Sequence, residues 1–250
     1  GMPIGRVDLG SGSISGFGGE AMAHYGMSLG RITSESRNEG DTIKHSRMRI
    51  EGFVIAPPPR GIETLQMRIA LQAMGLKDLR LGFDCNGSED RGKAEVTVER
   101  CVVNGPELGE IDFSTKLVGA DADFWRAVDE GDGLALLRTK AGLSGARLVI
   151  ADRGLVERSL KAIATTTGQP LAKVRAGLAQ EIRRYQPADV LITEDMTRLL
   201  DTIARFIETG GTLAIEAKPE APLGVDKLAY FTRPGPDFVR TLGLRASLTK

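Results

Sequence analysis

Oxygen-bearing side chains recur in one short stretch with a spacing that could bind calcium. They stand at positions 1, 3, 5, 7 and 12 of that stretch: Asp84, Asn86, Ser88, Asp90 and Glu95. A helix–loop–helix calcium site uses these positions, but it also needs a glycine at position 6 and a helix on each side. Position 6 is Glu89, the flanks alternate as strands do, and Arg91 and Lys93 add positive charge. The stretch therefore predicts a polar hairpin turn, and we expect no metal and no other cofactor.

The chain has two cysteines, Cys85 and Cys101, which bracket most of this stretch. If residues 79–85 and 94–101 form a tight hairpin, Cys85 lies near the turn and Cys101 about seven positions, or roughly 23 Å, further along. A disulfide tolerates Cα separations only up to about 7 Å. A tight hairpin therefore predicts that the two cysteines are not bonded. A bond would require strands that are not adjacent or that are strongly bulged.

Two other features could carry chemistry. The glycine-rich residues 9–19 follow a strand-like segment, but the spacing of Gly10, Gly12 and Gly16 does not match a dinucleotide-binding or phosphate-binding loop. A strand broken by glycines is the better interpretation. The histidines, His24 and His45, lie on strand-like or loop segments without a second histidine at metal-binding spacing. We find no nucleophile elbow, so a hydrolase-like enzyme using His24 or His45 remains only an alternative.

The bulk composition is that of an ordinary globular protein with a balanced charge. The 250 residues carry 33 basic and 33 acidic side chains, 41% hydrophobic residues and 5% aromatic residues. Zero net charge gives no electrostatic footprint for nucleic acid, and no stretch has the roughly 20 apolar residues of a membrane helix. Residues 1–10 lack the apolar core of a signal peptide. We therefore expect a periplasmic or envelope-associated location if the N-terminus is truncated, and a cytoplasmic one otherwise.

The N-terminal half alternates as strands do. In residues 42–56, Met48, Ile50 and Val54 share one parity and Gly52 is a candidate bulge. Residues 78–84, 94–103 and 109–119 also alternate, for example with Ile111 and Phe113 on one side. Such alternation predicts an antiparallel sheet with one face on a core and one in water.

Helical spacing appears once in this half, at residues 61–76, with an expected apolar stripe and Gly75 just past the end. The stripe consists of Ile62, Leu65, Ile69 and Met74. After residue 120 we expect helices at 121–130 and 153–166, one that begins at Pro170 and carries Leu171, Val174, Leu178 and Ile182, and one that begins after Thr193 and stops at Gly210–Gly211. Asp121 and Thr193 are the expected N-caps. Strands are expected at 146–152, in the segment after Gly211 and at the C-terminus.

Together these patterns predict an α+β fold: a large, mostly antiparallel sheet with amphipathic helices concentrated in the C-terminal half. We expect one domain over residues 1–250, with a subdivision into a strand-rich layer, 1–120, and a helix-rich layer, 121–250, as an alternative. The beginning of the second layer contains Trp125, which we expect in the core rather than at a ligand.

Two segments suggest a relationship. Residues 78–119 resemble the long alternating strands of AsmA-like and related lipid-handling proteins of bacterial cell envelopes. Residues 146–180 resemble a strand–helix–helix stretch of exported proteobacterial proteins. The resemblance spans residues 78–218 and implies an exported domain that binds or scaffolds.

The sequence thus favours a non-catalytic, envelope-associated binding domain over an enzyme. One-sided strands and long amphipathic helices predict an apolar cleft or an exposed apolar patch that holds a lipid or another apolar ligand. A purely structural homo-oligomer is a third hypothesis. No nucleic acid and no integral membrane segment are expected.

Overall fold

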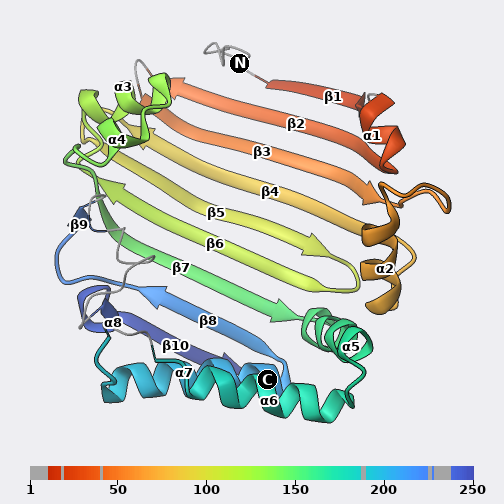
Figure 1. The fold of residues 1–250 in the computed structure, drawn as a ribbon. Helices are drawn as coiled ribbons and strands as arrows, with labels where there is room; N and C mark the ends of the chain where they lie inside the picture. Colours follow the sequence, from red (N-terminus) through yellow and green to blue (C-terminus); the bar gives the residue numbers. More distant parts are fainter. Residues whose placement is uncertain (1–10, 18–19, 40–41, 187–189, 225–226, 228–237) are drawn as a thin grey trace.

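A computed structural model describes residues 11–17, 20–39, 42–186, 190–224, 227 and 238–250. Within them the backbone forms one antiparallel ten-stranded sheet, in the order β1-β2-β3-β4-β5-β6-β7-β8-β10, with β9 paired to β7 (Figure 1). The strands are β1 Ser11–Phe17, β2 Met27–Glu39, β3 Thr42–Ile55, β4 Leu79–Asp90, β5 Glu95–Gly105, β6 Gly109–Val118, β7 Gly142–Asp152, β8 Thr212–Ala217, β9 Leu223–Gly224 and β10 Leu244–Thr249.

Most of the helical residues follow β6. The helices are α1 Glu20–His24, α2 Leu65–Ala73, α3 Ala122–Glu130, α4 Gly133–Leu136, α5 Leu155–Thr167, α6 Leu171–Arg183, α7 Glu194–Thr209 and α8 Phe238–Thr241. The predicted α+β class, the antiparallel sheet and the concentration of helices in the C-terminal half are confirmed. No described helix is long and apolar enough to cross a membrane.

The helix ends follow the expected capping chemistry. The Asp121 side chain accepts hydrogen bonds from the backbone N–H groups of Asp123 and Phe124, and the Thr193 side chain accepts one from Met196. Gly75, past the end of α2, has the positive φ of +71° expected there. The helix expected to begin at Pro170 begins one residue later, at Leu171, and Pro170 is its N-cap.

A bulge in β3 changes which residues share a face. Gly52 has a φ of +68°, and the β3–β4 register shifts between Ile50 and Phe53. The predicted bulge is therefore confirmed, but the predicted grouping of Val54 with Ile50 is wrong. Phe53, which pairs with Leu81, lies on the same face as Ile50, whereas Val54 pairs with Arg80 on the other face.

The buried core lies in the C-terminal half. Helices α5, α6 and α7 pack on β7, β8 and β10 around Leu160, Phe206 and Leu213. At the opposite ends of the strands, α3 packs Phe124 near Val96 and Leu117, with Trp125 half-buried against this cluster. By contrast, no apolar side chain of β2, β3 or β4 is buried among the residues described.

The short helix α2 departs from expectation in its packing. The helix itself is confirmed, but its predicted apolar stripe is not buried, because Ile62, Leu65 and Ile69 are exposed. The residues that turn inward are Thr64 and Leu71. The 3.6-residue period located an apolar face correctly but could not say whether another element covers that face.

Candidate binding face

One face of the sheet is apolar across seven neighbouring strands. Residues that pair directly across strands share a face, and one such row runs from β2 to β8: Ile32, Ile50, Phe83, Val103, Ile111, Ile150 and Leu213. A parallel row passes through Met48, Cys85, Cys101, Phe113, Leu148 and Ile215. The alternation read from the sequence therefore gives one apolar face across these strands, but the register shifts in β3 and β5 change its parity within those two strands.

Helices cover only part of this face. Ile150, Leu213 and Ile215 pack beneath α5–α7. On β3–β6 the apolar side chains are half-buried or exposed, and we call this part the open apolar face: Met48, Ile50, Phe53, Leu81, Phe83, Val103, Ile111 and Phe113. Val103, Ile111 and Phe113 keep 37–39% of their surface exposed. No described helix crosses the middle of strands β2–β6 in Figure 1.

One end of the open apolar face has a pocket of about 290 Å³. Its apolar lining includes Met48, Cys85, Val98 and Trp125. The indole Nε1 of Trp125 is buried and has no hydrogen-bond partner among the residues described. The sequence prediction of Trp125 as a core residue is therefore only partly right, because its ring also forms a wall of this pocket.

A charged pair lies against the same tryptophan. Glu89 is buried on the apolar side of β4, opposite Val96, and accepts a hydrogen bond from Arg91. The Arg91 guanidinium carbon lies 5.1 Å from the centre of the Trp125 ring, a cation–π distance. The ion pair neutralises a carboxylate that would otherwise be costly to bury.

At the other end of the strands, Arg158 of α5 ties three elements together. Its Nη1 donates to the backbone oxygens of Met74, at 3.1 Å, and Gly75, at 3.3 Å, just past α2. Its Nη2 donates to the carboxylate of Glu107, between β5 and β6. This end of the sheet is therefore braced by α2 and α5, as α3 braces the other.

The opposite face of the sheet is polar, and its charges alternate in sign from strand to strand. They are Arg47 and Arg49 on β3, Asp84 on β4, Arg100 on β5, Glu110 and Asp112 on β6, Arg147 on β7, and Glu216 on β8. Arg100 lies 2.8 Å from Asp112, and Arg147 lies 3.0 Å from Glu216. These charged side chains are paired with one another.

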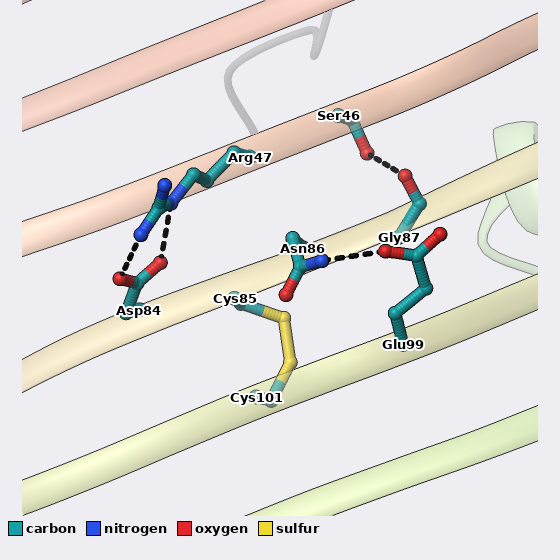
Figure 2. The surroundings of a disulfide bond; sticks show 8 residues. All are labelled: Ser46, Arg47, Asp84, Cys85, Asn86, Gly87, Glu99 and Cys101. Carbon is teal, nitrogen blue, oxygen red and sulfur yellow. Dashed lines mark hydrogen bonds and ion pairs between the residues drawn. A yellow bond between two sulfur atoms is a disulfide. The ribbon is translucent and has the colours of Figure 1, made fainter.

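Asp84 is the most strongly held member of this ladder. Arg47 Nε donates to Asp84 Oδ1 at 2.8 Å (Figure 2). Arg49 Nη2 donates to Asp84 Oδ2 at 2.9 Å. The hydrogen bonds from Arg47, supported by Arg49, lower the pKa of Asp84 to about 2. An ionised carboxylate shared by two arginines is a structural ion pair.

The remaining calcium candidates have other partners. Asn86 donates to Glu99 at 2.6 Å, and Asp90 lies 3.0 Å from Lys93. Asp84, Asn86, Ser88 and Asp90 lie along the extended strand β4 instead of converging as ligands in a loop. Glu95, the fifth candidate, begins β5 and lies 3.0 Å from Lys116. Among the described residues no group of three or more histidine, cysteine or acidic side chains could hold a metal.

Cys85 and Cys101 form a disulfide between β4 and β5 (Figure 2). The expectation from a tight hairpin at residue 85 is wrong because the strands continue to Asp90 and restart at Glu95, with the turn at 91–94. The two cysteines are therefore directly opposite each other, with Cα atoms 3.9 Å apart. A bulge in β5 between Val98 and Arg100, which pair with the consecutive residues Gly87 and Asn86, also places Cys101 on the same face as Cys85.

The histidines are not brought together. His24 is exposed at the end of α1, and its ring packs edge-on against Tyr25. His45 lies on β3 opposite Arg37. Neither ring makes a hydrogen bond or an ion pair with a described residue, and neither lines the pocket beside Trp125. The hydrolase alternative stays a prediction without a carboxylate partner for its base.

Sequence alternation located the apolar face but not its open part. Among the described residues, six of the eight helices follow residue 120. The two that precede it, α1 and α2, are too few and too short to cover the strands of that half. Residues 102–248 match a family model whose description is "Uncharacterized protein". No curated protein and no solved structure matches the chain.

Proposed function

The chain belongs to the family of uncharacterised proteins whose model matches residues 102–248, and we propose that it is a non-catalytic binding domain that holds an apolar ligand on the open apolar face. The observation that carries the proposal is the interruption of the helical cover. The same cross-strand rows are packed beneath α5–α7 at Ile150 and Leu213 but uncovered at Val103 and Ile111. Contiguous exposed apolar surface of this kind is typical of ligand and partner sites.

The shape of the surroundings favours a slender ligand. Neighbouring strands lie about 4.8 Å apart, so β3–β6 offer a strip roughly 14 Å wide. Helices α5–α7 border it along β7, and α3 covers Val96 and Leu117 near one end. A long acyl chain fits such a bordered strip, and each buried methylene contributes about 0.8 kcal/mol. A flat protein surface would contact the bordering helices before it reached the strip between them.

The disulfide supports an extracytoplasmic location. Disulfides persist mainly in oxidising compartments, and both cysteines of the chain are used in this one bond. An envelope-associated domain that handles lipid agrees with the class of protein that residues 78–218 resemble. The charged side chains of the polar face already pair with one another and gain little by contacting a ligand. We therefore assign the free energy of ligand binding to the open apolar face.

The test is a titration of the full chain with a fluorescent long-chain fatty acid. Phe113→Asp places a charge on the open apolar face and is expected to weaken binding by at least about tenfold, since an unpaired charge is costly beside an apolar ligand. Ser114→Asp is the matched control, because it changes the next residue of β6 on the opposite face, beside Arg147. The control should bind like the parent protein.

Two results would overturn the proposal. One is the absence of saturable binding by the parent protein, and the other is equal affinity in both variants. Light scattering, which measures the oligomeric state, gives a further test. A parent dimer that Phe113→Asp converts to a monomer would assign the face to a second copy of the chain instead.

A further inference from the structure

Helix α2 is amphipathic with its apolar side outward. Leu65 and Ile69, on one side of it, are 44% and 48% exposed, and Ile62, in the turn that leads into the helix, is 85% exposed. The side turned to the body of the protein carries Thr64, Arg68 and Leu71. Arg68 Nη1 donates to Thr64 Oγ1 at 2.6 Å and to the Pro58 oxygen at 2.8 Å. The helix thus turns its one charged side chain, the half-buried Arg68, inward with the buried Leu71, and leaves Leu65 and Ile69 exposed.

The position of α2 links this surface to the open apolar face. The helix connects β3 to β4, and the adjoining strand ends, Ile55 and Leu79, are a direct cross-strand pair. Leu79 shares a face with Leu81, a member of the open apolar face. The contacts from Arg158 to Met74 and Gly75 fix the end of α2 beside α5. In Figure 1, α2 accordingly lies at the ends of β3 and β4 on the same side of the picture as α5.

The charges around the helix suit an anionic surface. Arg60 precedes α2 and Lys77 follows it, and both are exposed. Lys77 lies beside Asp78, a carboxylate that pairs with Arg80 and whose pKa is lowered mainly by Arg80 and in smaller part by Lys77. Between Arg60 and Lys77, Glu63 is the single acidic residue, and Arg68 is turned inward. An apolar helix face flanked by cations is typical of helices that lie on anionic membranes.

We propose that the outward face of α2 docks on an anionic lipid bilayer and brings the end of the open apolar face to the membrane, where an acyl chain enters. The role at the entrance rests on the proposed function; the docking itself does not. A nine-residue helix is about 14 Å long. The two exposed apolar side chains on it, together with Ile62 before it, bury far less than the roughly 800 Å² per partner of a stable protein interface. A surface this small suits weak, reversible membrane contact.

The experiment measures flotation of the full chain with vesicles of phosphatidylcholine alone or with about one-third phosphatidylglycerol. The parent protein is expected to float with the anionic vesicles and several-fold less with the neutral ones. Ile62→Ser and the combined Ile62→Ser/Leu65→Ser/Ile69→Ser variant should lose most of this binding. The matched control, Leu134→Ser/Leu137→Ser, removes exposed apolar residues from α4 and its C-cap and should float like the parent.

The single variant guards against misfolding, because Ile62 is the most exposed of the three residues. Arg60→Gln/Lys77→Gln should reduce the preference for anionic vesicles. Docking on lipid is overturned if the parent floats with neither vesicle, if the α2 variants float as well as the parent, or if light scattering shows a dimer that the α2 variants disrupt.

The fatty-acid titration separates this inference from the proposed function. Unchanged titration of the α2 triple variant, together with lost flotation, supports docking at the membrane as a step distinct from holding the ligand. If the parent floats on anionic vesicles but does not bind the fatty acid, docking stands and the role at the entrance is overturned.

Discussion

Ile111 of β6 and Ile150 of β7 are direct cross-strand neighbours on one face of the sheet, yet they lie in different surroundings. Ile150 packs against the cluster around Leu160 and Phe206, whereas Ile111 is 37% exposed. The edge of the helical layer therefore falls between two paired residues of the same type. Apolar side chains continue beyond that edge, so the open apolar face extends the surface on which the core is built.

Truncating side chains on the two sides of this edge should have unequal effects on stability. Phe206→Ala empties a buried site and is expected to lower the free energy of unfolding by about 3–5 kcal/mol. Phe113→Ala removes a side chain that is already 39% exposed, and about 1–2 kcal/mol is expected. Urea unfolding followed by circular dichroism measures both. Equal losses would show that Phe113 is covered in solution, for instance by a second copy of the chain.

The ion pairs of Asp84 should make stability depend on pH in acid. The pKa of Asp84 is lowered to about 2 by Arg47 and Arg49, whereas an unfolded aspartate has a pKa of about 3.9. A lowered pKa means that the stabilisation is fully present above about pH 4 and is lost as the pH falls toward 2. We expect Asp84→Asn to lower the free energy of unfolding by about 1–2 kcal/mol at pH 7, after allowing for the partial exposure of the pair.

Unfolding at pH 7 and near pH 2 checks this sign. The difference between the parent protein and Asp84→Asn should shrink in acid, because the parent carboxylate is then protonated as well. Glu216→Gln is the control. Its carboxylate pairs with Arg147 in a more exposed setting and should change stability by less than about 0.5 kcal/mol. A difference for Asp84 that grows in acid would contradict the assignment.

The sequence could predict most of the fold because its signals are local. Asp121, Thr193 and Gly75 mark helix ends through bonds and backbone angles within a few residues. Bulges and strand ends are less visible: the hairpin turn at 91–94 and the shift at Asn86 decided which residue faces Cys85. Cover over a face depends on elements far apart in the chain, so the exposure of Ile62 and Ile111 could not follow from periodicity alone.

Removing the disulfide should destabilise the sheet without changing its order. The bond joins residues 16 apart, and closing a loop of that size in the unfolded chain corresponds to about 3 kcal/mol. We expect Cys85→Ala/Cys101→Ala, or reduction of the parent protein, to lower the free energy of unfolding by about 2–3 kcal/mol while the far-ultraviolet spectrum is retained. Labelling of free thiols gives an independent check. Two reactive thiols in the oxidised protein would contradict the bond.

Two glycines offer a matched test of backbone constraint. Gly109 begins β6 with a φ of +119°, and a Cβ built there would lie 2.0 Å from the Ala151 oxygen. Gly109→Ala should therefore distort the pairing of β6 with β7 and lower the free energy of unfolding by at least about 2 kcal/mol. Gly177 lies within α6 with nothing within 4 Å of such a Cβ. Gly177→Ala should raise stability by about 0.5–1 kcal/mol, because alanine favours the helix. The opposite signs are expected because Gly109 has a positive φ and lies against the Ala151 oxygen, whereas Gly177 has neither constraint. If both variants shifted the urea midpoint in the same direction, the β5–β6 turn would differ from the one described.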